Sequence, residues 1–260
     1  MIKKNIHKGI VLAGGAGTRL HPLTKIISKQ LLPIYDKPMI FYPLSTLIHS
    51  GVKEIMIITS PDSIDLFKKL LGDGSQWEIK LEYAIQENPD GIAQSLTIAE
   101  KWLDNDPVIL ILGDNLFFGP NLHSKIRKAM QENDGATIFA YEVQNPTSFG
   151  VLNLDNENKI ISIEEKPKEP KSNWIVTGLY IYNNKAPSYT HELKKSARGE
   201  LEITDLNNKY LLNSELKAFF FDKDYSWLDT GTHEALLEAS NFVFTVEEKN
   251  KDKVVNLKTI

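Results

Sequence analysis

A stretch between Lys8 and Lys37 carries the residues best suited to bind phosphate. It opens with the apolar run Gly9–Ala13, which is typical of a buried strand. Three glycines follow this run: Gly14, Gly15 and Gly17. Because glycine has no Cβ, this backbone can adopt positive φ angles and turn its N–H groups toward an anion. Arg19 adds a permanently charged planar fork, and Lys29 adds a mobile ammonium group ten positions later, so the stretch suits a polyphosphate.

Two common phosphate-binding motifs do not match this loop. The dinucleotide fingerprint G-x-G-x-x-G, started at Gly15, needs a glycine where Leu20 stands, and the P-loop pattern G-x-x-x-x-G-K-[ST] does not occur in the chain. The remaining alternative is an ordinary glycine-rich turn with solvated basic residues behind it. Arg19, Lys29 and the prolines at positions 22, 33 and 38 make this alternative less favoured.

The same stretch resembles the sugar-1-phosphate nucleotidyltransferases, whose signature is a G-G-x-G-T-R-L loop followed by a lysine in a P-K or S-K-Q setting. Both parts stand here, as Gly14–Leu20 and Ser28–Pro33, and this version is closest to the glucose-1-phosphate thymidylyltransferase branch. Further motifs follow in the family's order as far as Glu247. The resemblance implies an enzyme that joins dTTP and glucose 1-phosphate into dTDP-glucose and pyrophosphate, the first step of dTDP-deoxysugar synthesis of the dTDP-rhamnose type. It also implies a Mg²⁺ cofactor and a homo-oligomer, a tetramer or a dimer.

Length and charge set the broad class of the protein. The chain has 260 residues, which is enough to bury a full core, and a net charge of −4. We expect one nucleotidyltransferase domain over residues 1–247, with a nucleotide-binding half at about 1–135 and a sugar-phosphate-binding half at about 136–247. A charged tail follows over residues 248–260. The negative charge argues against a nucleic-acid partner, which needs a basic surface.

Other class signals concern the compartment. The chain has no cysteine, which excludes disulfides, a thiolate zinc site and a thiol nucleophile. Met1–Lys4 lacks the apolar core of a signal peptide, and no apolar run approaches the ~20 residues of a membrane helix. We therefore expect a soluble cytoplasmic protein without a membrane partner.

The pattern of apolar residues predicts an α/β fold. In the first half, strands alternate with helices, which predicts a Rossmann-like, mostly parallel central sheet flanked by helices. The expected strands are Gly9–Ala13, Glu54–Thr59, Ile79–Ile85 and Pro107–Leu112, and the expected helices are Met39–Ile48, Ser60–Leu71 and Ile92–Leu103. From Ala136 onward, short turns separate strands at 137–143, 150–154, 159–165 and 174–182, which predicts a mixed or antiparallel, sugar-binding extension. A helix toward Leu212, a strand at Leu216–Phe221 and a final helix capped by Thr230 or Thr232 complete the expected order.

Three polar segments follow expected strand ends: the glycine loop, Gln86 and Asp114. Because open parallel sheets bind ligands at the carboxyl ends of their strands, we expect these segments to converge on one edge. Asp114 in Gly-Asp-Asn and Asp229 in Trp-Leu-Asp-Thr-Gly are the metal candidates, since Mg²⁺ takes one or two carboxylates besides substrate phosphates. Each alone is an ordinary turn aspartate, and the resemblance implies the metal role. The six histidines stand singly and indicate no zinc site.

The resemblance also implies a role for each site residue. The catalytic set comprises Arg19, Lys29 and Lys166. The nucleotide-binding set comprises Leu12, Gly14, Gly15, Ala16, Gly17, Thr18, Arg19, Gln86, Pro89, Asp90 and Gly91. The sugar-phosphate-binding set comprises Asn115, Gly150, Glu165, Lys166, Val176, Arg198 and Trp227. A solvated turn is the alternative for Glu164–Lys166.

The chemistry requires no general base, because the second pKa of a phosphate monoester lies near ~6 and the acceptor is already an oxyanion at neutral pH. The Gln86 amide carries both a donor and an acceptor, which suits a pyrimidine edge, but thymine and uracil stay undistinguished. Two alternatives stay open: a uridylyl- or cytidylyltransferase acting on another sugar 1-phosphate, and a non-catalytic nucleotide-sugar sensor. Longer family members continue into helices that build a feedback site, and here we expect weak feedback inhibition.

Overall fold

The computed structural model of the chain describes residues 6–251, 253–255 and 257. Within this range the chain forms two compact units. The glycine-loop unit comprises residues 7–89, 111–127 and the described residues from 225 onward, and the Arg198 unit comprises residue 6 with residues 90–110 and 128–224. Strand β6 (Val108–Leu112) and helix α5 (Leu122–Glu132) each begin in one unit and end in the other.

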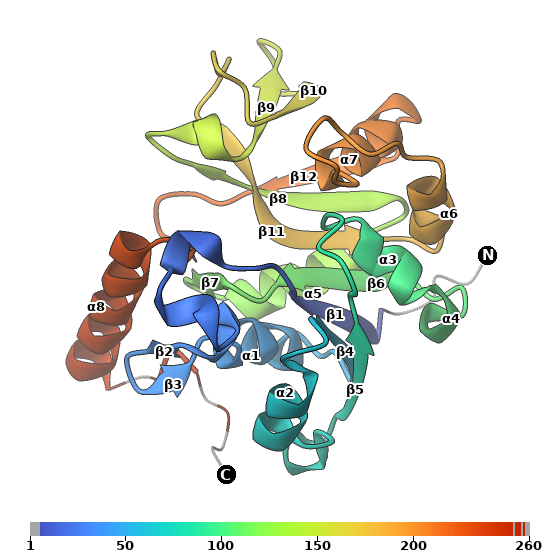
Figure 1. Cartoon of the computed structure of the whole chain (residues 1–260). Coiled ribbons are helices and arrows are strands. Elements are labelled where there is room, and N and C mark those ends of the chain that lie inside the picture. The colour runs from blue at the N-terminus through green and yellow to red at the C-terminus, as the bar shows by residue number, and fades with distance from the viewer. Residues whose placement is uncertain (1–5, 252, 256, 258–260) are drawn as a thin grey trace. The chain divides into compact units, whose positions relative to one another are not determined.

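The glycine-loop unit contains three parallel strands and two short antiparallel pairs. Its strands are β1 (Lys8–Ala13), β2 (Pro33–Ile34), β3 (Lys37–Pro38), β4 (Glu54–Thr59), β5 (Lys80–Ile85), β7 (Asn115–Phe118) and β13 (Ser226–Asp229). Its helices are α1 (Phe41–His49), α2 (Ile64–Leu71) and α8 (His233–Asn250). Helix α8 lies beside the β2–β3 pair, as Figure 1 shows.

The register of the parallel strands explains why their loops meet. Strand β4 pairs with β1 on one edge and with β5 on the other, and the last residues Ala13, Thr59 and Ile85 lie opposite one another. Strands β1 and β4 are buried after their first residue, as expected for apolar strands covered on both faces. The segments after β1, β4 and β5 therefore leave the sheet side by side.

The Arg198 unit is built on a mixed sheet. Its remaining strands are β8 (Ala136–Glu142), β9 (Gly150–Leu154), β10 (Ile160–Glu165), β11 (Trp174–Tyr182) and β12 (Leu216–Phe220). Its helices are α3 (Gln94–Ile98), α4 (Glu100–Leu103), α6 (Ala186–His191) and α7 (Ile203–Leu212). Strand β11 pairs antiparallel with β8 and β9, β10 pairs antiparallel with β9, and β12 pairs parallel with β8.

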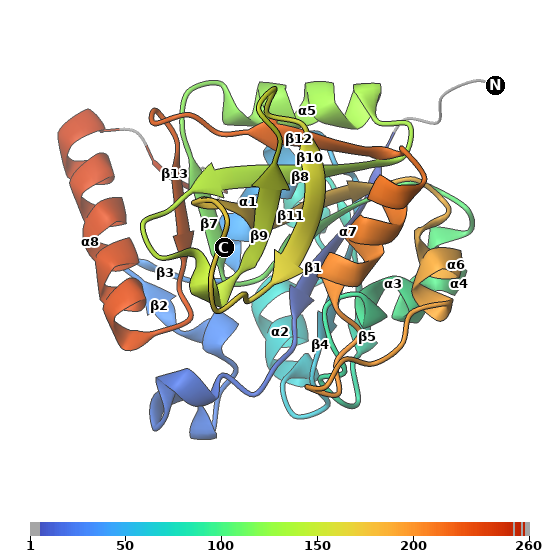
Figure 2. The same ribbon diagram turned by 90° about the horizontal axis from the view of Figure 1, so that it is seen from above.

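Helix α7 lies alongside this sheet, as Figure 2 shows. The side chain of Asn208 accepts a hydrogen bond from the Ile163 N–H (3.0 Å) and donates one to the Ile163 carbonyl (2.8 Å). Tyr182 is fully buried, and its hydroxyl donates to Asn207 on the same helix (2.6 Å). These contacts fix the middle of α7 against β10 and against the end of β11.

The predicted fold class is confirmed: one unit has parallel strands with flanking helices, and the other has a mixed sheet. Some boundaries were wrong. Helix α2 begins at Ile64 rather than at Ser60, and the expected helix Ile92–Leu103 is two short helices that meet at Ala99. Strands β7 and β13 and helices α5 and α6 were not predicted.

The last helix extends into the segment 248–260 that was expected to be a charged tail. Helix α8 starts after Thr232, whose side chain accepts from the Ala235 N–H (3.2 Å), and runs past Glu247 to Asn250. Val255 and Leu257 are buried. Residues 1–5, 252, 256 and 258–260 lie outside the described residues, and with them the N-terminal segment and part of the tail. Among the described residues, the structure has no helix of the length and apolarity that crossing a membrane requires.

Candidate active site

The glycine loop follows β1 at the carboxyl edge of the parallel strands. Gly15 and Gly17 have φ angles of 100° and 57°, which are costly for residues with a Cβ. Gly17 precedes a 3₁₀ turn at Thr18–Leu20, and its carbonyl accepts a hydrogen bond from the Thr24 hydroxyl (2.7 Å). The carbonyl of Leu12, in β1, accepts from the Gly113 N–H (2.8 Å).

Gln86 lies directly against this loop. Its backbone N–H donates to the Thr59 carbonyl (2.8 Å), and its side chain is 5% exposed. A Cβ built at Gly14 would stand only 2.4 Å from Gln86 Oε1, so this glycine makes room for the amide. The predicted convergence of the glycine loop and Gln86 on one sheet edge is therefore confirmed.

A cavity of about 520 Å³ opens beside Gln86. Its lining includes four residues predicted from the sequence: Gly15, Ala16, Gln86 and Pro89. It also includes Lys25, Ser60 and Asp62, which were not predicted. The cavity therefore combines loop backbone, small hydroxyls and one amide within the glycine-loop unit.

Asp114 lies in the turn between β6 and β7 and is 8% exposed. Its carboxylate forms a short ion pair with the Lys29 ammonium and accepts a hydrogen bond from the Asn115 amide (3.0 Å). Asn115 in turn accepts from the Trp227 indole N–H (2.7 Å). Burial disfavours the charge of Asp114, but Lys29 and then Asn115 outweigh it and lower the pKa of this carboxyl below its usual value.

Asp229 is brought to Asp114 by the antiparallel pair β7–β13, in which Asp229 lies opposite Asn115. The Thr230 N–H and hydroxyl both donate to the Asp114 carbonyl (3.1 and 2.8 Å), which fastens the two turns together. Burial, together with the charge of Asp114, raises the pKa of Asp229 from 3.8 to about 6. The Gly-Asp-Asn and Trp-Leu-Asp-Thr-Gly motifs, 115 positions apart between their aspartates, thus form one acidic pair.

Arg19 lies close to this acidic pair. A Cβ built at Gly231 would stand 2.6 Å from Arg19 Nη2 and 3.3 Å from Asp229 Oδ1, so glycine leaves room for both groups. The charge of Arg19 acts to lower the pKa of Asp229, although burial and Asp114 dominate. The glycine-loop unit therefore gathers two cations, Arg19 and Lys29, around two carboxylates.

The donor set fits Mg²⁺. The ion prefers oxygen ligands and is commonly held by one or two carboxylates together with substrate phosphates. The pKa of Asp229 is raised mainly by burial and then by the negative charge of Asp114, and a divalent cation held by the pair would offset this second cause. Among the described residues no group of three or more His, Cys, Asp or Glu side chains could hold a metal, so the acidic pair would need substrate oxygens to complete its coordination.

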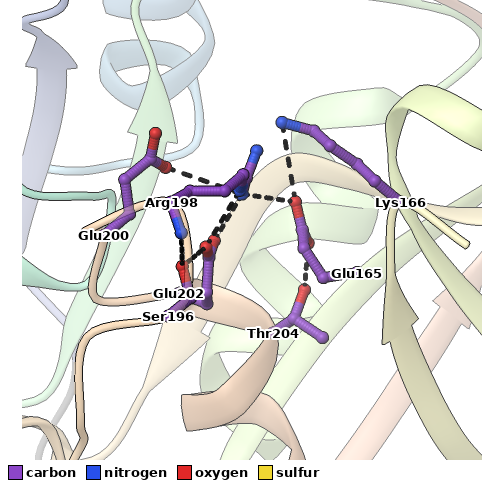
Figure 3. Close-up of polar contacts among 7 residues, drawn as sticks. All are labelled: Glu165, Lys166, Ser196, Arg198, Glu200, Glu202 and Thr204. Atoms are coloured by element: carbon purple, nitrogen blue, oxygen red, sulfur yellow. Dashed lines mark hydrogen bonds and ion pairs between the residues drawn. The ribbon is translucent and has the colours of Figure 1, made fainter.

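The Arg198 unit carries a second polar cluster, drawn in Figure 3. Glu165, the last residue of β10, accepts hydrogen bonds from the Thr204 hydroxyl (2.6 Å) and from Arg198 Nη2 (3.1 Å). Lys166 follows with a φ of 46°, a conformation that lysine rarely adopts, and its ammonium lies 3.8 Å from Glu165 Oε1. A Cβ at Gly150 would stand 2.9 Å from the Thr204 hydroxyl, so the glycine admits this contact.

The other predicted residues of the Arg198 unit are buried or tied to backbone. Val176 lies in β11 and is 8% exposed. The Asp90 carbonyl accepts from the Leu201 N–H (2.7 Å), and a Cβ at Gly91 would stand 2.3 Å from the Leu201 carbonyl oxygen. Asp90 and Gly91 thus belong to a different unit from Gln86 and Pro89, whereas Asn115 and Trp227 lie with the acidic pair.

Residues 8–246 match the family model described as nucleotidyl transferase. The chain belongs to this family. Among its relatives in this nucleotidyl transferase family, the glucose-1-phosphate thymidylyltransferase of Neisseria meningitidis serogroup A is 52% identical over 240 residues, which cover 92% of this chain and 83% of that protein. The enzyme of the same name from Mycolicibacterium smegmatis is 50% identical over 247 residues, which cover 95% and 85%.

Solved structures give the same placement. A Bacillus anthracis protein provisionally assigned as a glucose-1-phosphate thymidylyltransferase, in complex with a sucrose, superposes with a TM-score of 0.84 at 42% identity, covering 90% of this chain and 94% of that one. A UDP-glucose pyrophosphorylase complexed with UDP-glucose has a TM-score of 0.81 at 26% identity, covering 92% and 99%. The nucleotidyl transferase fold is thus shared along most of the chain.

Proposed function

We propose that this nucleotidyl transferase is a glucose-1-phosphate thymidylyltransferase that converts dTTP and glucose 1-phosphate into dTDP-glucose and pyrophosphate. One observation carries the proposal: the buried Asp114 and the partly buried Asp229 form a pair beside Lys29 and Arg19, in the same unit as the glycine loop and its cavity. A site that only recognised a nucleotide sugar would have little use for two crowded carboxylates, since they repel its phosphates.

In this proposal the glycine-loop unit binds the nucleotide. Gln86 meets the pyrimidine edge in the cavity, and the backbone around Gly15 and Gly17 cradles the phosphates. Arg19 holds triphosphate oxygens through its fork, and Lys29 donates to the oxygens around the α-phosphorus. Asn115 and Trp227 orient Asp114 by the hydrogen-bond chain already described.

Asp114 and Asp229 would hold the Mg²⁺ ion. When bound, the ion would neutralise charge on the phosphates during transfer. The chain's own contribution is to hold the two carboxylates close together in paired turns before any ligand arrives, so that little rearrangement accompanies binding.

The Arg198 unit binds the acceptor in this proposal. Lys166 and Arg198 bind the phosphate of glucose 1-phosphate, while Glu165, Gly150 and Val176 face the sugar. A phosphate oxygen of the acceptor attacks the α-phosphorus, the bond from this phosphorus to the β-phosphate bridging oxygen breaks, and pyrophosphate leaves. The attacking oxygen already carries negative charge near neutral pH, which is why no general base is needed.

A second candidate is a uridylyltransferase acting on glucose 1-phosphate. It is favoured by the superposition on a UDP-glucose pyrophosphorylase structure, although that protein is only 26% identical. A single methyl group in an apolar pocket discriminates by only about 1–3 kcal/mol, so some use of UTP is compatible with the first proposal. A homo-oligomer is also part of the proposal, supported only by the resemblance.

A substrate panel tests the proposal. Pyrophosphate release is measured with each of dTTP, UTP, CTP, ATP and GTP against the 1-phosphates of glucose, galactose, mannose and N-acetylglucosamine, with and without Mg²⁺. We expect the highest kcat/KM for dTTP with glucose 1-phosphate and no turnover after chelation. A higher kcat/KM for UTP than for dTTP would favour the second candidate. No turnover with any pair of substrates would favour the remaining alternative, a non-catalytic nucleotide-sugar sensor.

A further inference from the structure

Glu202 is the most buried carboxylate of the polar cluster around Arg198. It stands directly before α7, and its side chain is 7% exposed, whereas those of Glu165 and Glu200 are 24% and 39% exposed. A carboxylate at the start of a helix commonly accepts from the helix N–H groups, but the Glu202 side chain makes no such capping bond. Its hydrogen bonds are made elsewhere.

Those hydrogen bonds hold the guanidinium of Arg198 as a fork. Arg198 Nε donates to Glu202 Oε1 (3.1 Å), and Arg198 Nη2 donates to Glu202 Oε2 (2.6 Å). The Ser196 hydroxyl also donates to Glu202 Oε1 (2.6 Å) and accepts from the Arg198 N–H (3.2 Å). Two parallel bonds fix the plane of the guanidinium, which a single bond would leave free to rotate.

The remaining carboxylates gather on the same nitrogen. Glu165 and Glu200 both approach Arg198 Nη2, at 3.1 and 3.6 Å. Nε and Nη2 are therefore engaged, whereas Nη1 has no hydrogen-bond or ion-pair partner among the described residues. Figure 3 shows this nitrogen on the side of the guanidinium away from Glu202. An anion would be bound there.

The charge of the cluster makes this orientation consequential. Three carboxylates, Glu165, Glu200 and Glu202, surround the cations Arg198 and Lys166. Burial raises the pKa of Asp205, and the charges of Glu202 and Glu165 raise it further, which reflects the negative field at the start of α7. A phosphate dianion would be repelled by this cluster unless Arg198 were held with Nη1 turned toward it.

We infer that Glu202, supported by Ser196, is a positioning residue that holds Arg198 with Nη1 free to bind the phosphate of the acceptor sugar. This inference rests on the proposed function, because it takes a sugar 1-phosphate as the acceptor. Glu202 itself does not touch the substrate. The negative charge of Glu202 repels the phosphate of the acceptor, but the benefit of holding the Arg198 guanidinium in a fixed orientation exceeds this repulsion.

If only the charge of Glu202 mattered, removing it would lower the KM for glucose 1-phosphate, whereas losing its hold on Arg198 would raise this KM. A matched pair of variants therefore separates the two effects. Glu202→Gln and Glu200→Gln each remove one negative charge next to Arg198, but only Glu202→Gln places an amide NH₂ against the fork. We expect Glu202→Gln to raise the KM for glucose 1-phosphate by roughly tenfold, as for the loss of a charge-assisted hydrogen bond, with the KM for dTTP unchanged. We expect Glu200→Gln to leave the KM for glucose 1-phosphate unchanged or lower. Equal shifts in both variants, or a fall in Glu202→Gln, would overturn the inference.

Ser196→Ala guards against a folding defect in Glu202→Gln, since it removes one hydroxyl without changing charge. We expect a two- to fivefold rise in the KM for glucose 1-phosphate with an unchanged melting temperature, and an unchanged KM would contradict the inference. Chemical rescue gives a readout that a purely structural role would not move. Guanidinium ions should restore turnover to Arg198→Ala, and should fail with the double variant Arg198→Ala/Glu202→Gln. Equal rescue of both would count against Glu202.

The inference and the proposed function can fail separately. Calorimetric titration of glucose 1-phosphate into the nucleotide-free protein needs no turnover, and we expect the Kd to rise about tenfold in Glu202→Gln but not in Glu200→Gln. If wild type binds glucose 1-phosphate with this pattern yet forms no dTDP-glucose, the proposed function fails and the inference stands. If wild type forms dTDP-glucose but the two variants have the same Kd, the inference fails alone.

Discussion

Replacing either aspartate of the acidic pair should abolish activity, yet the two replacements should change stability in opposite directions. In Asp229→Asn, the fold loses a carboxylate whose pKa stands at about 6 instead of 3.8, mainly because of burial. The penalty is absent below pH 3.8, where this carboxyl is neutral in both folded and unfolded chains, and is fully present above about pH 6. A shift of about 2 pKa units corresponds to about 3 kcal/mol, so Asp229→Asn should raise the metal-free free energy of unfolding by up to that amount at pH 8.

We expect Asp114→Asn to lower the free energy of unfolding instead, because Asp114 is the ion-pair partner of Lys29, whose side chain is only 14% exposed. Leaving a buried cation without its partner costs several kcal/mol. Asp229 acts on Lys29 as well and becomes its remaining partner, which reduces the loss to about 1–3 kcal/mol. The double variant should then be less stable than the sum of the single changes predicts, because Lys29 loses both carboxylates.

Urea unfolding at pH 8 in EDTA, followed by circular dichroism, measures all four proteins. The same proteins are titrated with Mg²⁺ in the turnover assay, where both single variants should lose at least about 10²-fold in kcat. Asp224→Asn removes an exposed carboxylate five positions before Asp229 and serves as the control, with stability and kcat unchanged. Equal destabilisation of Asp114→Asn and Asp229→Asn, or near-wild-type kcat in either, would refute the reasoning.

Three further predictions concern single positions. Arg19→Lys should lower kcat by about 10²–10³-fold in a pyrophosphate-release assay, because a point charge does not replace a bidentate fork, whereas Arg127→Lys should not; unchanged kinetics would make Arg19 a solvated loop residue. Gly14→Ala should raise the KM for dTTP, because its Cβ would stand 2.4 Å from Gln86 Oε1, and an unchanged KM would remove Gln86 from the base pocket. The pKa of His123 is lowered to about 4 by burial, then by His49 and Arg127, so the unfolded chain binds this proton more readily and the free energy of unfolding falls as the pH falls from 6.5 to about 4. Over this pH range, the free energy of unfolding measured in urea should therefore fall by about 1–3 kcal/mol less in His123→Phe than in wild type. An equal fall in both proteins would contradict the lowered pKa of His123.

Much of the sheet was predictable because its strands carry strong signals. The runs at Glu54–Thr59 and Trp174–Tyr182 consist almost entirely of apolar, aromatic or β-branched residues, and both were placed correctly. Helix α5 was missed although Leu122, Ile126 and Met130 are buried at helical spacing, a signal that the many charged residues between them obscured. Strands β7 and β13 are four residues each, too short for periodicity to reveal, and they exist because they pair with each other.

The site was predictable only where a motif stood. The acidic pair follows from two motifs, but the indole of Trp227 reaching Asn115 is a tertiary contact that no spacing reveals. Glu202 was missed because the sequence alone predicts a helix cap or a solvated residue for a glutamate just before a helix. Only the two hydrogen bonds from Arg198 in the structure distinguish Glu202 from Glu200. Ser60 and Asp62 were interpreted as a helix start, whereas the structure places them in the cavity lining ahead of α2.

The most direct test of the central claim follows the α-phosphorus. The protein is incubated with [α-³²P]dTTP, glucose 1-phosphate and Mg²⁺, and the labelled products are separated by chromatography and identified by mass. We predict that the label appears in dTDP-glucose, that pyrophosphate is released unlabelled in equal amount, and that neither forms with Asp114→Asn or Asp229→Asn. Label in dTMP without dTDP-glucose, or no product with any sugar 1-phosphate, would contradict the assignment of this site to thymidylyl transfer.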